Sequence, residues 1–391
     1  MDKRIRVGQI IYGFSIEGPG GGIGRFGIDL SKALDQDRFE VLLVGLWDRG
    51  SQAEVNRIEQ LRAQGLQVFT GAAWDEAKPY KSFWKSYGKI RKVFAQEPPD
   101  IIHSHSEFGD IAALLLKVYL RSPSILRSVH YGYQFEWRKR PLRRILLTNL
   151  LYPLMFRQEI GVSRSITENL NRRRLSRGAI CIPNAIDLER FRNQQVDPLE
   201  VKKELGLDPR ACLVGTIGRL TEQKGFRYFI EAIPSVLQVL PDTQFLVIGE
   251  GELEVELKDQ CQRSGILPKV VFTGPRTDVE RLLPCLDLFV SSSLWEGLPT
   301  VILESMAAGV PVVGTSIPGT IELIQDQVTG WLGSPGDSKG LAAAILRGLG
   351  DASARNEVRM QAQKVVDKFS IQSIAAEHEL LYSKIVARGL R

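Results

Sequence analysis

Residues 286–300 read LDLFVSSSLWEGLPT, and they decide how the whole chain is interpreted. An apolar, strand-like run ends in a small polar loop that carries Glu296, and Pro299 opens a helix predicted over 300–308 that contains Glu304. Ligands of open parallel sheets bind at the carboxyl ends of strands. The free N–H groups and the dipole of a helix N-terminus favour an anion such as a diphosphate, and a carboxylate one turn further on can bind ribose hydroxyls. The segment therefore predicts a nucleotide-sugar site.

Strand-like and helix-like segments alternate along the rest of the chain. Apolar runs of strand length are separated by longer segments of helical character. The predicted strands are 5–11, 40–46, 67–70, 100–105, 125–130, 159–162 and 179–182 in the first half, and 212–217, 244–248, 270–273, 286–291 and 310–314 in the second. Because the pattern starts twice, we expect an α/β protein with two Rossmann-like, doubly wound parallel sheets that face each other across a cleft.

A polar, turn-rich stretch between Pro183 and Pro209 marks the boundary between these two domains. A chain of 391 residues is too long for one ordinary core, so two domains are the natural division. We place the first at 1–185 and the second at 186–368. The last segment, 369–391, is predicted to form one amphipathic helix.

Composition is that of a globular protein, with 43% hydrophobic and 25% charged residues. No apolar run reaches the roughly 20 residues that a membrane span needs, since Thr148, Asn149 and Pro153 interrupt the longest one, 145–156. The first residues lack the apolar core of a signal peptide. The four cysteines form no CxxC pair, so we expect reduced core cysteines in a cytoplasmic protein.

The net charge of +6 is unevenly distributed, because 131–177 contains eleven basic residues and only three acidic ones. Within this region, 137–156 mixes basic, aromatic and aliphatic residues as interfacial segments do. This pattern predicts peripheral contact with an anionic membrane surface on the inner face, and the alternative is an ordinary solvated face. No recognition helix, RNP motif or zinc signature accompanies the charge, so nucleic acid is not an expected partner.

Two other segments, each following a predicted strand, also predict phosphate binding. Gly18–Arg25 is rich in glycine, which lets a phosphate or sugar approach the backbone closely, although a flexible turn is the alternative. Its spacing is not the GxGxxG of dinucleotide-binding proteins. In 218–225, GRLTEQKG, Arg219 and Lys224 lie at a strand-to-helix crossing. Two cations there could clamp a diphosphate and neutralise it as it leaves, and a surface ion-pair site is the alternative.

Three histidines end predicted strands of the first half. His103 and His105 end one strand, and His130 ends the next. A histidine at such a strand end points into the ligand crevice of an α/β domain, and a buried structural histidine is the alternative. No further ligands for a metal accompany this group, and 35–37, DQD, reads as a solvated turn. We therefore expect no metal.

Taken together, these motifs resemble the retaining glycosyltransferases of family 4, which have the two-domain GT-B fold. The resemblance covers essentially the whole chain and rests, in order, on Gly20–Gly22, Asp100–His105, His130, Val162-Ser163, Ile182–Asn184, 218–225, Ile248–Gly251, Phe272–Gly274, Glu296 with Glu304, Pro318–Glu322 and Thr329-Gly330. The chain departs from the family twice. Ala185 stands where a glycine is common, which implies a changed hinge turn, and Val129 stands before His130 where many members have threonine.

The resemblance implies a role for each matching residue. Arg219 and Lys224 would bind the donor diphosphate, Glu296 would hold the transferred sugar, and Glu304 would bind the ribose. The other donor-binding positions would be Gly21 and Gly22 in the first domain, Gly297, Leu298 and Thr300 as backbone or hydroxyl donors, and Gly274 and Arg276 beside the base. His130 would contact the sugar at the reacting face. The final helix would cross back to pack on the first domain.

We therefore expect a sugar to move from a nucleotide diphosphate sugar to an acceptor hydroxyl with retained configuration, without a metal or other cofactor. The departing phosphate would accept the acceptor's proton. A lipid-linked sugar or a growing polysaccharide of the cell envelope would suit the basic stretch. Two alternatives remain: a nucleotide-sugar epimerase of the same fold, and a catalytically silent nucleotide-sugar-binding protein. Epimerases usually carry more acidic and histidine residues in the cleft, and the intact set of charged residues argues against a silent protein.

Overall fold

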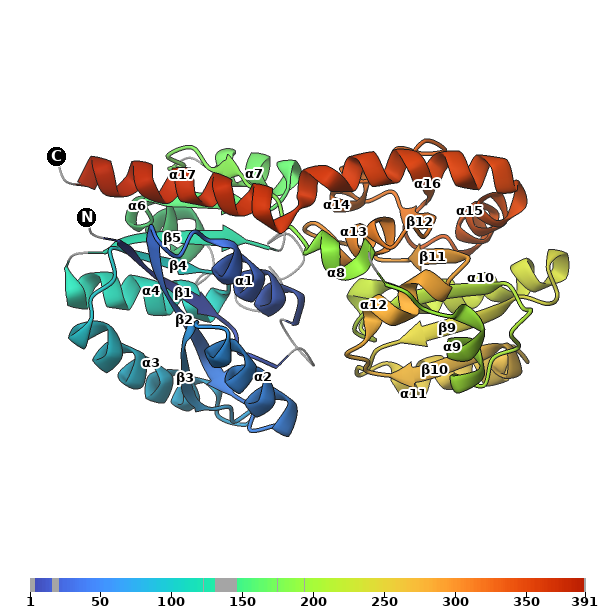
Figure 1. The fold of residues 1–391 in the computed structure, drawn as a ribbon, viewed down its shortest axis with the longest axis horizontal. Helices are drawn as coiled ribbons and strands as arrows, with labels where there is room; N and C mark the ends of the chain where they lie inside the picture. The colour runs from blue at the N-terminus through green and yellow to red at the C-terminus, as the bar shows by residue number, and fades with distance from the viewer. Residues whose placement is uncertain are drawn as a thin grey trace. The chain divides into compact units, whose positions relative to one another are not determined.

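The computed structural model describes residues 4–15, 21–121, 123–130, 146–173, 175–192 and 194–389, and it divides into two compact units (Figure 1). Unit 1 consists of residues 1–184 together with 371–391, and unit 2 consists of residues 185–370. Each unit contains one sheet, and neighbouring strands pair in parallel in both. The predicted α/β class with two doubly wound parallel sheets is therefore confirmed.

Unit 1 holds a seven-stranded sheet in the order β3-β2-β1-β4-β5-β6-β7. Its strands are β1 (Ile5–Ile11), β2 (Phe39–Asp48), β3 (Gln67–Ala73), β4 (Ile101–Ser104), β5 (Ser124–Val129), β6 (Gln158–Gly161) and β7 (Ile180–Cys181). Its helices are α1 (Gly21–Ala33), α2 (Gln52–Ala63), α3 (Pro79–Gln96), α4 (Glu107–Leu120), the π-helix η3 (Leu147–Leu151), α6 (Tyr152–Met155), α7 (Arg164–Asn171) and α17 (Ile371–Gly389). The C-terminal helix α17 thus belongs to unit 1.

Helices cover both faces of the unit 1 sheet because side chains of a strand alternate between its faces. Ile10 points into a core that it shares with α3, α4 and α6, whereas Ile11 points into a second core with α1 and α2. Gln9 lies on the same face as Ile11 and contacts Tyr382 of α17. A polar residue in the middle of an apolar strand is thereby placed under the C-terminal helix.

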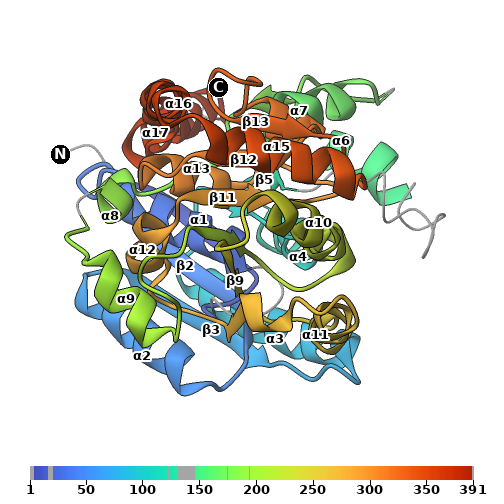
Figure 2. The ribbon, with the colours of Figure 1, turned by 90° about the vertical axis from the view of Figure 1, so that its right-hand side faces the viewer.

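Unit 2 holds a six-stranded sheet in the order β10-β9-β8-β11-β12-β13. Its strands are β8 (Leu213–Ile217), β9 (Gln244–Ile248), β10 (Val270–Gly274), β11 (Leu288–Ser291), β12 (Val312–Thr315) and β13 (Trp331–Gly333). Its α-helices are α8 (Leu188–Arg192), α9 (Pro198–Glu204), α10 (Phe226–Val239), α11 (Glu254–Arg263), α12 (Val279–Leu282), α13 (Thr300–Ala307), α14 (Pro318–Ile321), α15 (Ser338–Gly350) and α16 (Ala352–Val366), and its 3₁₀ turns are η4 (Glu222–Lys224), η5 (Leu267–Lys269), η6 (Leu283–Cys285) and η7 (Asp367–Phe369). Figure 2 shows α10 and α15 side by side against this sheet, where they form its main core.

Three local expectations change with the structure, and a fourth lies partly outside the described residues. Gly21 and Gly22 begin α1 instead of lying in an open loop, and 16–20 fall outside the described residues. Phe369 ends η7, so the last helix starts at Ile371. Of the basic stretch 137–156, the part up to 145 also lies outside the described residues, and 146–156 is mostly helical. Cys181 is exposed, because β7 is a two-residue edge strand, so the expectation of four core cysteines was wrong there.

Among the described helices, none is both long and apolar enough to cross a membrane.

Candidate functional site

The loop that follows β11 is fixed against the turn η4 by hydrogen bonds between the two segments. Ser292 Oγ donates to the carbonyl of Lys224 at 2.9 Å, and the backbone N–H of Leu294 donates to the carbonyl of Gln223 at 2.8 Å. The Gln223 side chain in turn donates to the carbonyl of Trp295 at 3.1 Å. Two segments that lie about seventy residues apart in sequence thus form one structure at the carboxyl ends of β8 and β11.

Lys224 and Glu296 form an ion pair at the centre of this structure. Lys224 Nζ lies 2.5 Å from Glu296 Oε1, and the side chains are 20% and 7% exposed. Ser293 Oγ donates to the same carboxylate oxygen at 2.8 Å, and Gln223 Nε2 lies 3.4 Å from the other. The sequence predicted different ligands for Lys224 and Glu296. The structure places the two charges in direct contact, with the lysine partly open to solvent.

Glycines let the backbone segments around this pair come very close. Gly225 has a φ of +61°, and a Cβ there would lie 2.2 Å from the carbonyl oxygen of Ser292. Gly249 has a φ of +135°, and its Cβ would lie 2.0 Å from the carbonyl oxygen of Gly218. Such contacts exclude any side chain. The Lys224 stem packs over Gly218, with Cε 3.4 Å from where a Cβ would stand, so the bare backbone of Gly218 helps to position the ammonium.

Arg219 differs from Lys224 in having no hydrogen-bond or ion-pair partner among the described residues. It follows Gly218 at the end of β8, it is partly exposed, and its guanidinium forms no hydrogen bond or ion pair with any residue in the described ranges. Because an unpaired guanidinium offers a planar set of five donors, it suits a phosphate or carboxylate. Arg219 is thus the cation that is available to a ligand at this strand end, whereas Lys224 is already paired with Glu296.

Helix α13 carries the remaining acidic residue, Glu304, together with Thr300, and the other predicted donors, Gly297 and Leu298, lie in the loop before it. It begins at Thr300, so Pro299 stands just before the helix and not in its first turn. Glu304 is only 5% exposed. The Leu298 side chain is buried, and a Cβ at Gly319 would lie 2.4 Å from the carbonyl oxygen of Gly297, so α14 packs directly on this loop. The first-turn N–H groups of α13 lack intrahelical acceptors, as at any helix start.

The two predicted residues beside the base lie at the end of β10. Gly274 has a φ of +70°, and its carbonyl accepts the backbone N–H of Gly249 at 2.9 Å. The Arg276 guanidinium binds Asp278 at 2.7 Å and Glu204 at 3.3 Å. The hydrogen bond to Asp278, together with that to Glu204, raises the pKa of Arg276 above its usual range. With both carboxylates on its fork, Arg276 is less available to a ligand than the resemblance suggested.

His130, the predicted catalytic residue of unit 1, is buried just beyond the end of β5. Its Nε2 lies 3.4 Å from His105 Nδ1, and its ring packs edge-on against Phe26. Burial lowers the pKa of His130 to about 3, and only the nearby Asn184 side chain acts in the opposite direction. The ring is therefore neutral at physiological pH. Gly21 and Gly22 lie in the first turn of α1, in the same unit.

Sequence reasoning missed several residues that the structure adds to these sites. Gln223 and Ser293 bind the Glu296 carboxylate, but a polar residue in a loop gives no periodic signal. His378 and Tyr382 of α17 join the histidines of β4 and β5. Their spacing of four residues, which places both on one face of a helix, was the available signal.

No group of three or more His, Cys, Asp or Glu side chains within the described part of the chain is arranged to hold a metal ion. Burial raises the pKa of the Cys212 thiol to about 12, with Asp287 adding to the effect. Burial likewise raises the pKa values of Cys261 and Cys285 to about 11. These three thiols are protonated near neutral pH and are poor nucleophiles.

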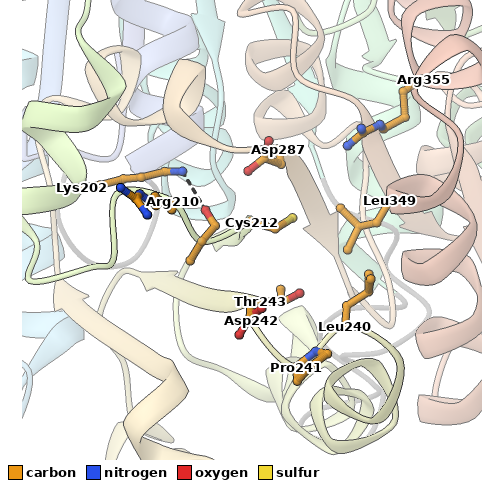
Figure 3. Close-up of a pocket in the computed structure, with 11 residues that line it drawn as sticks. Lys202, Arg210, Cys212, Leu240, Pro241, Asp242, Thr243, Asp287, Leu349 and Arg355 are labelled. Atoms are coloured by element: carbon orange, nitrogen blue, oxygen red, sulfur yellow. Dashed lines mark hydrogen bonds between the residues drawn. The ribbon is translucent and has the colours of Figure 1, made fainter.

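A pocket of about 420 Å³ lies in unit 2, but at the opposite edge of its sheet (Figure 3). Cys212, Thr243 and Asp287 line it, and each immediately precedes a strand. Lys202 Nζ donates to the carbonyl of Ala211 at 2.8 Å there. Since ligands of parallel sheets bind at the carboxyl ends of strands, this pocket is separate from the candidate site.

Comparison with known proteins identifies the family. The model for Glycosyltransferase Family 4 matches residues 20–190, and the model for Glycosyl transferases group 1 matches residues 211–351. The UDP-Gal:alpha-D-GlcNAc-diphosphoundecaprenol alpha-1,3-galactosyltransferase of Escherichia coli is 30% identical over 321 residues, which cover 77% of this chain and 80% of that protein. The lipopolysaccharide core biosynthesis mannosyltransferase LpsB of Rhizobium meliloti is 32% identical over 212 residues, or 51% of this chain and 60% of that one.

Solved structures agree with this assignment at the level of the fold. HepE of Anabaena, in complex with UDP-glucose, aligns with a TM-score of 0.82 and 22% identity over 97% of this chain and 100% of that one. Sucrose-phosphate synthase of Thermosynechococcus elongatus aligns with a TM-score of 0.81 and 20% identity, over 98% and 100%. The chain, with its two Rossmann-like units, therefore belongs to glycosyltransferase family 4, the group 1 glycosyl transferases, and is a glycosyltransferase.

Proposed function

We propose that this glycosyltransferase moves a hexose from a UDP-sugar to a hydroxyl of a lipid-linked or polysaccharide acceptor, with retained anomeric configuration. The observation that carries the proposal is the Lys224–Glu296 pair at the carboxyl ends of β8 and β11, together with Arg219, which follows β8 and has no partner among the described residues. This arrangement combines cations for a diphosphate with a carboxylate for sugar hydroxyls. The E. coli relative, named for UDP-Gal and a diphosphoundecaprenol acceptor, supports the donor and acceptor classes.

In the proposed reaction, unit 2 binds the donor and the chain supplies no nucleophile. Arg219 and Lys224 neutralise the diphosphate, Glu296 accepts hydrogen bonds from the sugar hydroxyls, and Glu304 accepts them from the ribose. The bond from the anomeric carbon to the diphosphate breaks, and the bond to the acceptor oxygen forms on the same face. The acceptor's proton passes to the departing phosphate oxygen. Positive charge fixed beside that oxygen stabilises the transition state more than the ground state.

Unit 1 would supply the acceptor side of the reaction in this proposal. His130 would contact the transferred sugar, and Gly21 and Gly22 at the start of α1 would approach the diphosphate. The domain roles follow the same division, with residues 1–185 on the acceptor side and 186–368 on the donor side. Because the chain is a family 4 glycosyltransferase, sugar transfer is favoured over the two alternatives, an epimerase and a silent binding protein.

The donor is tested by thermal shift with UDP, GDP, ADP and their hexose conjugates. We expect the uridine nucleotides to give the largest increase in Tm, since a ligand at about 100 times its Kd adds about 2.7 kcal/mol to the stability of the folded state. Glu304→Ala should reduce the Tm increase given by UDP. The same substitution should have a smaller effect on the Tm increase given by a UDP analogue that lacks the ribose hydroxyls. A larger shift with GDP or ADP would refute the uridine assignment and leave the proposed cation and carboxylate roles standing.

An apolar stripe in unit 1 supports a membrane-bound acceptor. Leu146, Leu150 and Leu154, spaced four residues apart on one helical segment, are 52%, 39% and 43% exposed. Basic residues flank the segment. The pKa of Lys117 is lowered by burial and then by the neighbouring charges of Arg157 and Arg177, so these three cations lie close together. Exposed leucines beside clustered cations suit an anionic bilayer surface, and we propose peripheral association on the inner membrane face.

Vesicle flotation tests this surface directly. We expect the protein to bind vesicles that contain phosphatidylglycerol, to bind pure phosphatidylcholine weakly, and to be released at about 0.5 M salt, because the Debye length then falls to a few ångströms. Leu150→Glu combined with Leu154→Glu should abolish flotation. Leu380→Glu is the matched control, since Leu380 is an exposed leucine of α17 in the same unit. Vesicle binding that does not depend on salt and is unchanged in the double variant would contradict the proposal.

A further inference from the structure

The exposed apolar side chains of unit 1 gather on one layer of helices. Helices α3, α4 and η3 with α6 pack on the same core, and Figure 1 shows α3, α4 and α6 one after another along one side of the sheet. Among the described residues sixteen large hydrophobic side chains are exposed, and seven of them lie on this layer. Four belong to α3 and α4, namely Tyr80, Trp84, Val118 and Tyr119, and the other three are the leucines of 146–154. The helices of the other face, α1, α2 and α17, carry two such side chains in their described parts, Val55 and Leu380.

Helix α3 adds an uncompensated positive charge to this layer. Between residues 79 and 96 it has five basic residues and no acidic one, whereas α2 on the other face has two of each. Its inner face packs in the core through three apolar side chains, Phe83, Ile90 and Phe94. On its outer face Lys81, Lys85 and Lys92 are exposed, and none of the three has a hydrogen-bond or ion-pair partner among the described residues. Their spacing of four and seven residues places them on one side of the helix.

Aromatic rings of the same layer are held in place at the surface. Trp84 is 57% exposed, and its ring packs edge-on against Phe83 and Tyr87, with ring centroids 5.4 and 5.8 Å away. The Arg91 guanidinium lies over the Tyr119 ring, 4.9 Å from its centroid, and this contact joins the surface of α3 to that of α4. Because these rings are already ordered, little conformational freedom is lost when they bind a partner. The layer therefore presents a preformed surface of rings and cations.

This combination of side chains fits an anionic bilayer better than a soluble polyanion. Tryptophan and tyrosine concentrate at the interface between membrane and water, aliphatic side chains enter the acyl boundary, and lysines are attracted to lipid phosphates. A nucleic acid or an acidic polysaccharide would bind the lysines of α3, but it would leave Val118 and the leucines of 146–154 exposed to water. A bilayer covers the charged and the apolar parts of the layer together.

We propose that α3 is a membrane-docking helix, whose outward lysines bind the phosphates of anionic lipids while Trp84 and Tyr80 enter the headgroup region. Unit 1 then rests on the bilayer with its whole α3–α4–α6 layer, and not with the segment 146–156 alone. This inference rests on the proposed function, because it extends the membrane surface proposed there. One layer of helices is about 10 Å thick, so the carboxyl edge of the unit 1 sheet lies close enough to the bilayer for a short lipid-linked acceptor to reach it.

Replacement of the three outward lysines tests the electrostatic part of the proposal. The variant combines Lys81→Gln, Lys85→Gln and Lys92→Gln. Its binding to vesicles of phosphatidylcholine and phosphatidylglycerol in equal amounts should weaken about 100-fold, because each lysine near such a surface contributes about 5-fold to the affinity. Flotation over a series of lipid concentrations measures the change.

The matched control removes the same charge from exposed positions outside the layer. It combines Lys32→Gln, Lys203→Gln and Lys384→Gln. Its binding to the same vesicles should change less than about 3-fold, because charges more than a Debye length from the lipid surface are largely screened. Substitutions at exposed positions of this kind have small effects on stability, and the Tm of both variants checks that each is folded.

Tryptophan fluorescence tests whether α3 enters the headgroup region. Bromine atoms on the lipid acyl chains quench a tryptophan that lies close to them, so the emission of the unsubstituted protein should fall when it binds vesicles that contain brominated lipid. Trp84→Phe should show less quenching at the same bound fraction. Trp295→Phe, which removes a partly exposed tryptophan of unit 2, is the control and should be quenched as much as the unsubstituted protein. Equal quenching in Trp84→Phe would overturn the insertion of α3.

Comparison with Leu150→Glu combined with Leu154→Glu separates this inference from the proposed function. If that double variant fails to float while the lysine variant of α3 binds like its control, the membrane association stands and the inference is overturned. If the unsubstituted protein binds no vesicles, the proposed association fails and the inference fails with it. If soluble polygalacturonate or single-stranded DNA binds more tightly than the vesicles, and replacement of the lysines removes that binding, α3 is a site for that polymer and the inference is overturned as well.

Discussion

Lys224→Ala is expected to lower kcat/KM by about 10²–10³ while the protein remains folded. The magnitude is that of removing one fixed donor from a developing negative charge, about 2.7–4 kcal/mol of transition-state stabilisation. Arg219→Ala should have an effect of the same order, because both cations would face the departing diphosphate. Steady-state assays of UDP release from the preferred UDP-hexose, at donor concentrations above and below KM, measure the change.

The same substitution also breaks an ion pair, so stability must be measured alongside. Glu296 loses the ammonium at 2.5 Å but keeps the Ser293 hydroxyl at 2.8 Å, and we expect a loss of about 1–3 kcal/mol in the free energy of unfolding by urea. Lys258→Ala is the matched control. Lys258 lies 2.7 Å from Glu254 on the surface of α11 in the same unit, so its loss should cost less than about 1 kcal/mol and leave kcat/KM unchanged.

Two results would remove the assignment of the cations. If Lys224→Ala and Lys258→Ala turn over equally well, then Lys224 has no part in the reaction. If Arg219→Ala keeps full activity while Lys224→Ala loses both activity and folding, then the lysine is only structural. Glu296→Gln tests the ion pair from its other side, because it keeps the size of the side chain and removes only the charge that faces Lys224.

The sequence predicted the region around Glu296 well because its local signals agree there. The apolar run before Ser291 is bounded by a polar loop, and Pro299 limits where the next helix can start. The strand expected over 286–291 is β11, and the helix expected over 300–308 is α13. Short elements gave no such signal: β13, Trp331–Gly333, was not predicted, since three residues are too few for any period to show.

Contacts between distant segments were the main part that could not be predicted. Gln9 and Tyr382 are 373 residues apart, and Lys224 and Glu296 are 72 apart. Placing both charged residues near one ligand followed from the strand order of α/β folds, but their direct pairing depends on how the loop after β11 packs on η4. The cluster of four histidines likewise requires α17 to lie on β1, β4 and β5, which no local pattern specifies.

Unit 1 is expected to lose stability steeply as the pH falls from 7.5 to 5.5, whereas unit 2 is not. All four histidines belong to unit 1, and burial lowers the pKa of each below its unfolded value near 6.5, to about 3 for His130 and about 4 for His378. In this pH range the unfolded chain binds protons that the folded unit does not. Stability therefore rises with pH and is lost as the pH falls below about 6.5.

The size of this effect is comparable with the stability of an ordinary domain. At pH 5.5 each buried neutral histidine contributes a loss of about 1.4 kcal/mol, so four contribute at most about 6 kcal/mol, against a typical 5–15 kcal/mol for unfolding. Asp110 acts in the opposite direction. Burial raises its pKa to about 6 despite the nearby Arg127, so the folded unit gains a proton there and recovers about 1 kcal/mol at the same pH.

Hydrogen exchange followed by mass spectrometry, corrected for the intrinsic pH dependence of exchange, measures the two units separately in one sample. Protection of peptides from β1, β4 and β5 should fall between pH 7.5 and 5.5, and protection of peptides from β8, β9 and β11 should hold. His378→Phe keeps an aromatic ring against Phe26 and removes one titrating group, so the pH dependence of unit 1 should decrease by about a quarter. Equal protection of unit 1 at both pH values would mean that the histidines are not held neutral in the folded unit, and the prediction would be wrong.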